Sequence, residues 1–157
     1  MNCKICSSLS KFMFKAKILN KYSICYFHCQ NCKFLQTEDP FWLEESYKSP
    51  ITDWDTGILS RNIWLRNIAT SIIFFLFNKS KSFLDYAGGY GIFVRMMRDS
   101  GIDFYWEDKN TNNLFAKGFE ISYHSEEIEM VTCFEAFEHF EEPLIELENL
   151  LDYSKNI

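Results

Sequence analysis

Two pairs of cysteines near the N-terminus constrain the fold more than any other feature of the sequence. Cys3 and Cys6 are separated by two residues, as are Cys29 and Cys32, and 22 residues lie between the pairs. Two residues between thiols let one tight turn direct both sulfur atoms at a single ion, and two such turns complete a tetrahedral four-sulfur site. The spacing therefore predicts a structural Zn²⁺ site with these four ligands in a zinc-ribbon-like module, residues 1–37.

Several alternatives stay open at this site. Cys25 and His28 are close enough in sequence to replace a ligand, although Cys25 belongs to a β-prone run, residues 22–27, that leads into the second pair. Thiolates also hold iron–sulfur clusters, and the cysteines could be ordinary buried thiols. Residues 1–37 contain six lysines and no acidic residue, a charge that would offset the negative charge of four thiolates around zinc.

A glycine-rich turn is the second informative feature. Residues 82–87 are predicted to form a short buried strand, Gly88-Gly-Tyr-Gly91 a turn, and residues 92–99 a helix that ends near Gly101. Glycine allows the backbone to turn sharply and to approach a ligand, and the N-terminus of a helix presents free N–H groups. The order strand, glycine turn, helix predicts a nucleotide-binding α/β unit.

Two acidic residues follow the next predicted strand, residues 103–106. Glu107 and Asp108 stand where a carboxylate can accept hydrogen bonds from both ribose hydroxyls of a nucleotide, and Asp108 lies 17 residues after Gly91. A dinucleotide motif needs a third small residue, and Val94 occupies that position. A nicotinamide-dependent oxidoreductase is therefore the weakest of the functions considered.

The glycine turn resembles the first motif of the class I S-adenosylmethionine-dependent methyltransferases, which is an acid, a spacer and three alternating glycines. The motif stands here as Leu84-Asp-Tyr-Ala-Gly-Gly-Tyr-Gly91, with Ala87 in place of the first glycine. The segment Glu129–Pro143 is similar to the family's fourth strand, here residues 128–134, and the E-H-x-x-x-P sequence that follows it. Cysteine pairs ahead of a methyltransferase domain also occur in family members that modify sugars or surface polysaccharides.

The resemblance implies roles for the matching residues. The glycine turn and the acid before it would form the pocket for the amino-acid end of S-adenosylmethionine. Asp108, or alternatively Glu107, would bind the ribose. His139 and His124 are candidate bases for methyl transfer, with purely structural roles as the alternative. The expected cofactor-binding residues are Asp85, Ala87, Gly88, Gly89, Gly91, Asp108 and Glu135.

The expected fold is α/β, with an incomplete Rossmann-like methyltransferase sheet at residues 82–157. A connecting helical segment, residues 38–81, would join this sheet to the zinc-ribbon-like module and would contain a helix at residues 58–77. The family's sheet has seven strands, so the resemblance implies a truncated or split enzyme whose fourth strand is an exposed edge. For this sheet the sequence offers at most four strands, at residues 82–87, 103–106, 119–122 and 128–134.

Charge and hydropathy exclude some partners. The net charge of −6 argues against a nucleic-acid binder. The longest apolar run, residues 68–77, falls short of the about 20 residues of a membrane span, and no secretory signal precedes it. A cytoplasmic location is therefore expected.

The sequence thus predicts an S-adenosylmethionine-dependent methyltransferase that acts on a small molecule, with a sugar or polysaccharide precursor as the acceptor that the resemblance implies. The expected protein partner is a second copy of the chain or a separate C-terminal half. The alternative function is a non-catalytic zinc-binding interaction module with a degenerate nucleotide-binding fold.

Overall fold

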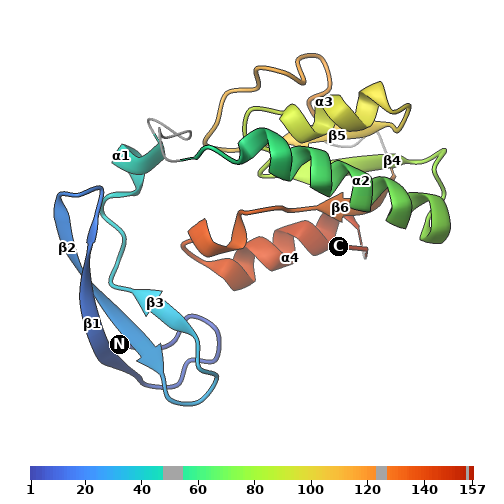
Figure 1. Cartoon of the computed structure of the whole chain (residues 1–157). Coiled ribbons are helices and arrows are strands. Elements are labelled where there is room, and N and C mark those ends of the chain that lie inside the picture. Colours follow the sequence, from blue (N-terminus) through green and yellow to red (C-terminus); the bar gives the residue numbers. More distant parts are fainter. Residues whose placement is uncertain (48–54, 123–126, 155) are drawn as a thin grey trace. The chain divides into compact units, whose positions relative to one another are not determined.

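The computed structural model describes residues 1–47, 55–122, 127–154 and 156–157 (Figure 1). The chain divides into two compact units. The first contains Met1–Ser49 with Phe140–Glu146, and the second contains Pro50–His139 with Leu147–Ile157. The first unit is built on an antiparallel sheet and the second on a parallel sheet with helices, so the chain is a mixed α/β protein.

The sheet of the first unit has the order β1-β2-β3. Its strands are β1 (Ser10–Ile18), β2 (Tyr22–Cys29) and β3 (Leu35–Thr37). Leu19 and Asn20 connect β1 to β2, both with positive φ, as a tight hairpin turn requires. The β-prone run that the sequence indicates before the second cysteine pair is therefore confirmed as a strand. A short helix, α1 (Leu43–Tyr47), follows the sheet.

The second unit contains a parallel sheet of order β5-β4-β6. Its strands are β4 (Ser82–Tyr86), β5 (Phe104–Glu107) and β6 (Ile128–Thr132), and β4 pairs in parallel with both neighbours. The three strands predicted at these places are confirmed, because short apolar runs bounded by turn residues suit a sheet that is covered on both faces.

The strand predicted at residues 119–122 is wrong. This segment makes a single parallel bridge between Glu120 and Trp106, on the side of β5 away from β4. The Trp106 amide donates to the carbonyl of Phe119 at 2.8 Å, and the Ile121 amide donates to the carbonyl of Trp106 at 3.0 Å. The segment therefore occupies the position next to β5 without extending into a strand.

Helices cover both faces of the parallel sheet. The predicted helix at residues 58–77 is confirmed as α2 (Ile58–Leu76), and it packs on one face together with α3 (Ile92–Asp99). On the other face lies α4 (Pro143–Tyr153), whose Tyr153 ring is 6.2 Å from the ring of Tyr86. None of the helices in the described ranges is long and apolar enough to cross a membrane.

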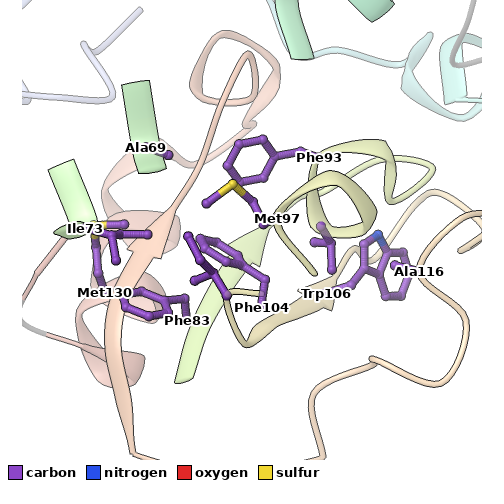
Figure 2. Close-up of a cluster of buried hydrophobic side chains, with 11 residues drawn as sticks. Ala69, Ile73, Phe83, Phe93, Met97, Phe104, Trp106, Ala116 and Met130 are labelled. Atoms are coloured by element: carbon purple, nitrogen blue, oxygen red, sulfur yellow. The ribbon is translucent and has the colours of Figure 1, made fainter. Parts of the chain in front are cut away.

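The hydrophobic core lies between the sheet and the helices α2 and α3. The rings of Phe83 and Phe104 are stacked with centroids 5.3 Å apart, and Phe93 from α3 meets Phe104 edge to face. Figure 2 shows Met97 beside these rings. This core fixes the carboxyl ends of the strands, which is where ligands bind in open α/β sheets. Its remaining buried members are Ala69, Ile73, Val94, Ile102, Trp106, Ala116 and Met130.

The outer side of β6 is partly paired. The Val131 amide donates to the carbonyl of Asn156 at 2.8 Å, and the Asn156 side-chain amide donates to the carbonyl of Glu129 at 2.7 Å. Residues after α4 thus lie along the strand that the sequence predicts as an exposed edge. The interpretation of the chain as a truncated or split enzyme stays a prediction.

Candidate functional site

The four paired cysteines lie together in the first unit. Their Sγ atoms are all within 4.8 Å of one another, with 3.5 Å between Cys3 and Cys32 and 3.5 Å between Cys6 and Cys29. A tetrahedral zinc with Zn–S bonds of about 2.3 Å separates its sulfur atoms by about 3.8 Å. The donor set and its spacing therefore fit Zn²⁺, and the predicted clustering of the four thiols is confirmed.

Both cysteine pairs sit in turns of the same kind. The residue after each pair, Ser7 or Lys33, has a positive φ, which brings the chain back toward the sheet. The Ile5 amide points at Cys3 Sγ, 3.4 Å away. Hydrogen bonds from the side chain and backbone of Ser8 lower the pKa of the Cys6 thiol to about 5. The Ser8 donors favour the thiolate form of Cys6, which is the form that binds a metal.

The two substitute ligands considered from the sequence lie outside this cluster. Cys25 is in the middle of β2, where it pairs with Lys15. His28 precedes Cys29, and its Nδ1 is 3.3 Å from the side-chain nitrogen of Gln30. The cluster is therefore made by the two C-x-x-C pairs.

The glycine turn places three alternating residues in the left-handed region. Ala87, Gly89 and Gly91 have φ values of 57°, 55° and 82°. These are the three positions of the alternating glycine motif, and only glycine adopts this conformation without steric cost. Ala87 takes it at a cost of about 1 kcal/mol. The turn thus keeps its shape although one glycine is replaced.

Gly88 and Gly91 are needed because neighbouring groups leave no room for a side chain. A Cβ built on Gly88 would lie 2.8 Å from Asp85 Oδ2 and 2.9 Å from Trp106 Cδ1. A Cβ on Gly91 would lie 2.8 Å from the Cβ of Ala116. Gly91 therefore packs against the segment after β5, whereas Gly88 and Gly89 face a cavity.

This cavity has a volume of about 210 Å³ and opens at the carboxyl ends of β4 and β6. Of the predicted cofactor-binding residues, it brings together Asp85, Ala87, Gly88, Gly89 and Glu135. Gly91 and Asp108 are not among its lining residues. The other residues that line it are Ile58, Arg61, Asn62, Leu65, Tyr90, Ile92, Phe93, Thr111 and Phe134.

Asp108 is nevertheless joined to the glycine turn. Its Oδ2 accepts a hydrogen bond from the Gly89 amide at 2.9 Å, and its Oδ1 accepts from the amides of Asn110 and Thr111. Glu107, the alternative ribose ligand, instead accepts a hydrogen bond from the Tyr153 hydroxyl, on the face covered by α4. The geometry therefore favours Asp108 over Glu107 as the carboxylate beside the turn.

Asp85 is the most perturbed acid of the site. It is buried, and its Oδ1 accepts a hydrogen bond from the Thr132 hydroxyl at 2.6 Å. Burial raises the pKa of Asp85 to about 7; the Thr132 hydrogen bond opposes this rise, and the negative charge of Asp108 adds to it. Near neutral pH this carboxyl group is therefore partly protonated.

The raised pKa of Asp85 predicts that stability falls with rising pH. Its pKa is higher in the folded chain than in the unfolded chain, so the folded state binds more protons between pH about 4 and about 7. The contribution of Asp85 to the free energy of unfolding is complete below pH 4 and is lost as the pH passes 7. A shift of three pKa units corresponds to roughly 4 kcal/mol. We expect wild type to melt at a lower temperature at pH 8 than at pH 5.

The variant Asp85→Asn provides the comparison, because its side chain still accepts from Thr132 and does not ionise. The melting temperatures of both proteins, followed by circular dichroism at pH 5 and pH 8, measure the effect. A smaller difference in the variant is expected. The same difference in both proteins would show that other groups cause the pH dependence.

The residues after β6 differ in their relation to the cavity. Glu135 lines it and has a φ of 53°, a left-handed conformation that is uncommon for glutamate and concentrated at functional sites. His139 is in the 3₁₀ helix η1 (Phe137–His139), its side chain is 65% exposed, and it is not among the described lining residues. His124 lies outside the described residues.

Sequence reasoning missed three residues of this site. Thr132 is opposite Asp85 in the register of β4 and β6, which no local spacing reveals. Trp106 donates its indole N–H to the carbonyl of Gly89 at 2.9 Å and so fixes the turn. Arg61 belongs to α2, far in sequence from the glycine turn, yet it lines the cavity. The sequence signal for Arg61 is its position on the polar side of the helix, away from the apolar residues.

Comparison with known families gives one finding. A family model described as a methyltransferase domain matches residues 61–156, which is more than half of the chain. The matched region contains the parallel sheet, the glycine turn and nearly all of the cavity lining. A comparison with curated proteins found no match.

Proposed function

The chain belongs to the methyltransferase-domain family, and from this premise we propose that its cavity binds S-adenosylmethionine and that the protein transfers the methyl group of this cofactor to a small-molecule acceptor. The observation that carries the proposal is the hydrogen bond from the Gly89 amide to Asp108. It joins the turn after β4 to an acid after β5, at the edge of the sheet where nucleotides bind.

Different residues of the chain would bind different parts of the cofactor. Asp108 has lone pairs left on both oxygen atoms, so it can accept hydrogen bonds from ribose hydroxyls. The backbone of Ala87–Gly89 lines the cavity and can approach the cofactor closely, because Gly88 and Gly89 carry no side chain. The carboxylate of Glu135, and that of Asp85 when it has lost its proton, suit the positive charge of an ammonium group. The bound cofactor supplies a methyl group on a positively charged sulfur.

The acceptor and the base belong to the proposal and follow from the resemblance described above. We propose a small molecule, with a sugar or polysaccharide precursor as the favoured class. His139 stands four residues after Glu135 with an exposed side chain, and it is the proposed base. Methyl transfer needs alignment of the two reactants and, where the acceptor carries a proton, its removal by a base of this kind.

The proposal includes a structural Zn²⁺ on Cys3, Cys6, Cys29 and Cys32. Four thiolates leave no open position for a substrate, so the metal would stabilise the first unit and take no part in methyl transfer. The four sulfur atoms within 4.8 Å of one another support this assignment. A second copy of the chain is the proposed partner.

Calorimetry with S-adenosylhomocysteine, the product form of the cofactor, tests the proposed function. Wild type is expected to bind it, and Asp108→Ala is expected to bind about 100-fold more weakly, because hydrogen bonds to a charged group are lost. Asp99→Ala is the matched control: this aspartate is exposed on α3 and pairs with Arg95. Binding equal to wild type is expected for the control, and absence of heat from wild type would contradict the proposal.

The alternative is a non-catalytic zinc-binding interaction module. The cysteine cluster favours it, because this cluster lies in the first unit and needs none of the cavity residues. The calorimetry above distinguishes the two functions when it is combined with zinc analysis and a measurement of size in solution. A folded, zinc-loaded oligomer without affinity for S-adenosylhomocysteine would favour the alternative.

A further inference from the structure

Arg61 is the one cationic side chain among the described residues that line the cavity. It lies in the first turn of α2, and the same cavity is lined by Glu135 and by Asp85, whose carboxyl group ionises near neutral pH. S-adenosylmethionine carries both signs at its amino-acid end, an ammonium and a carboxylate. A site with acidic side chains and one guanidinium matches this charge pattern, with the guanidinium as the group suited to the ligand's carboxylate.

Two acids hold Arg61 at the cavity. Its Nη2 is 2.8 Å from Asp55 Oδ1, and its Nε is 3.9 Å from Glu135 Oε2. A guanidinium has five N–H donors, and Asp55 uses one at hydrogen-bonding distance. Gly57 leaves space for the group, since a Cβ there would lie 3.0 Å from Arg61 Nη1. With respect to the described residues, Arg61 is therefore positioned with donors left for a ligand.

The order of the strands places Arg61 opposite the proposed ribose ligand. Glu135, beside Arg61, follows β6, whereas Asp108 follows β5, and β4 lies between these two strands. Neighbouring strands are about 4.8 Å apart, so the ends of β5 and β6 are separated by roughly 10 Å. A nucleotide with its ribose at Asp108 extends across the glycine turn and brings its other end toward Arg61.

We propose that Arg61 binds the carboxylate of the amino-acid end of S-adenosylmethionine, an inference that rests on the proposed function. Arg61 is then a cofactor-binding residue supplied by α2, outside the glycine motif. An anionic methyl acceptor would present the same chemistry, a carboxylate or phosphate, to the same guanidinium. Arg61 lies in the direction in which a cofactor with its ribose at Asp108 would extend. This position favours the cofactor over the acceptor as the source of the carboxylate.

Two ligands that differ only at the amino-acid end test this proposal by calorimetry on the full chain. S-adenosylhomocysteine has the carboxylate, whereas 5′-methylthioadenosine keeps the adenosyl thioether and lacks the amino acid. Arg61→Gln is expected to weaken binding of S-adenosylhomocysteine about 30-fold, the loss typical of a hydrogen-bonded charge pair. Binding of 5′-methylthioadenosine is expected to change by less than about 2-fold, which also shows that the variant is folded.

Two further variants sharpen the result. Arg66→Gln removes a guanidinium from the same helix that bonds to Asn67 and lies outside the cavity lining, so both affinities should equal those of wild type. Arg61→Lys keeps the charge and loses the forked geometry, so it should recover part of the affinity for S-adenosylhomocysteine.

The possible outcomes separate the two proposals. Equal weakening of both ligands in Arg61→Gln would overturn the inference, because Arg61 would then only support the cavity. Unchanged binding of S-adenosylhomocysteine would also overturn it, and a loss of turnover at unchanged cofactor affinity would assign Arg61 to an anionic acceptor. Wild type that binds neither compound would overturn the proposed function itself, and the inference with it.

Discussion

Replacing Cys29 by serine is expected to abolish binding of the proposed Zn²⁺ and to unfold the sheet of the first unit. Cys29 is fully buried, and its Sγ is 3.5 Å from that of Cys6. In residues 1–47 the buried apolar side chains are those of Cys3, Ile24, Cys29 and Trp42. So small a core cannot offset the entropy lost on folding, whereas structural zinc contributes about 10–16 kcal/mol in zinc-finger peptides.

Zinc content and hydrogen exchange measure this effect. The variant Cys29→Ser should contain almost no zinc, and the amides of β1 and β2 should lose their protection. Cys25→Ser is the matched control, because Cys25 lies in the same strand and outside the four-sulfur cluster. The control should keep both zinc and protection. If Cys29→Ser retained them too, the cysteines would be ordinary buried thiols.

Gly88→Val is expected to destabilise the second unit and to abolish binding of S-adenosylhomocysteine. Even a Cβ at this position would lie within 3 Å of Asp85 Oδ2 and Trp106 Cδ1. Trp106 cannot move away easily, because its indole donates to the carbonyl of Gly89. Overpacking of this kind costs about 3 kcal/mol, and the displaced turn would no longer line the cavity.

The variant Gly101→Ala measures the loss of stability that backbone strain alone causes, because a side chain at this position has enough space. Gly101 follows α3 with a φ of 78°, and a Cβ there meets no atom within 4 Å. Alanine at this position should cost only about 1 kcal/mol and leave binding unchanged. Urea unfolding followed by circular dichroism, together with calorimetry, compares the two variants. If Gly88→Val were no less stable than Gly101→Ala, the packing around Gly88 would not limit the fold.

Features that depend on near neighbours in sequence were predictable. The C-x-x-C spacing anticipates the clustering of four sulfur atoms, because each pair needs only one turn. The alternating motif at residues 87, 89 and 91 anticipates the left-handed backbone, because each conformation is a property of a single residue. The helices at residues 58–76 and 92–99 follow from the periodicity of their apolar residues.

Features that depend on the order and register of strands were decided by the tertiary structure. The segment at residues 119–122 has the composition of a strand, yet it makes only one bridge to β5. Glu107 and Asp108 are adjacent in sequence, and the alternation of side chains along β5 sends Glu107 to Tyr153 while Asp108 meets Gly89.

The sequence by itself determined the spacing of the paired cysteines, the glycine turn and the elements around it, because these are set by residues only a few positions apart. The tertiary structure alone decided that Arg61 from α2 and Glu135 after β6 line the same cavity, and that Thr132 bonds to the buried Asp85. These residues are separated by about 50 or more positions in the chain, and they meet because parallel pairing brings the carboxyl ends of β4 and β6 together.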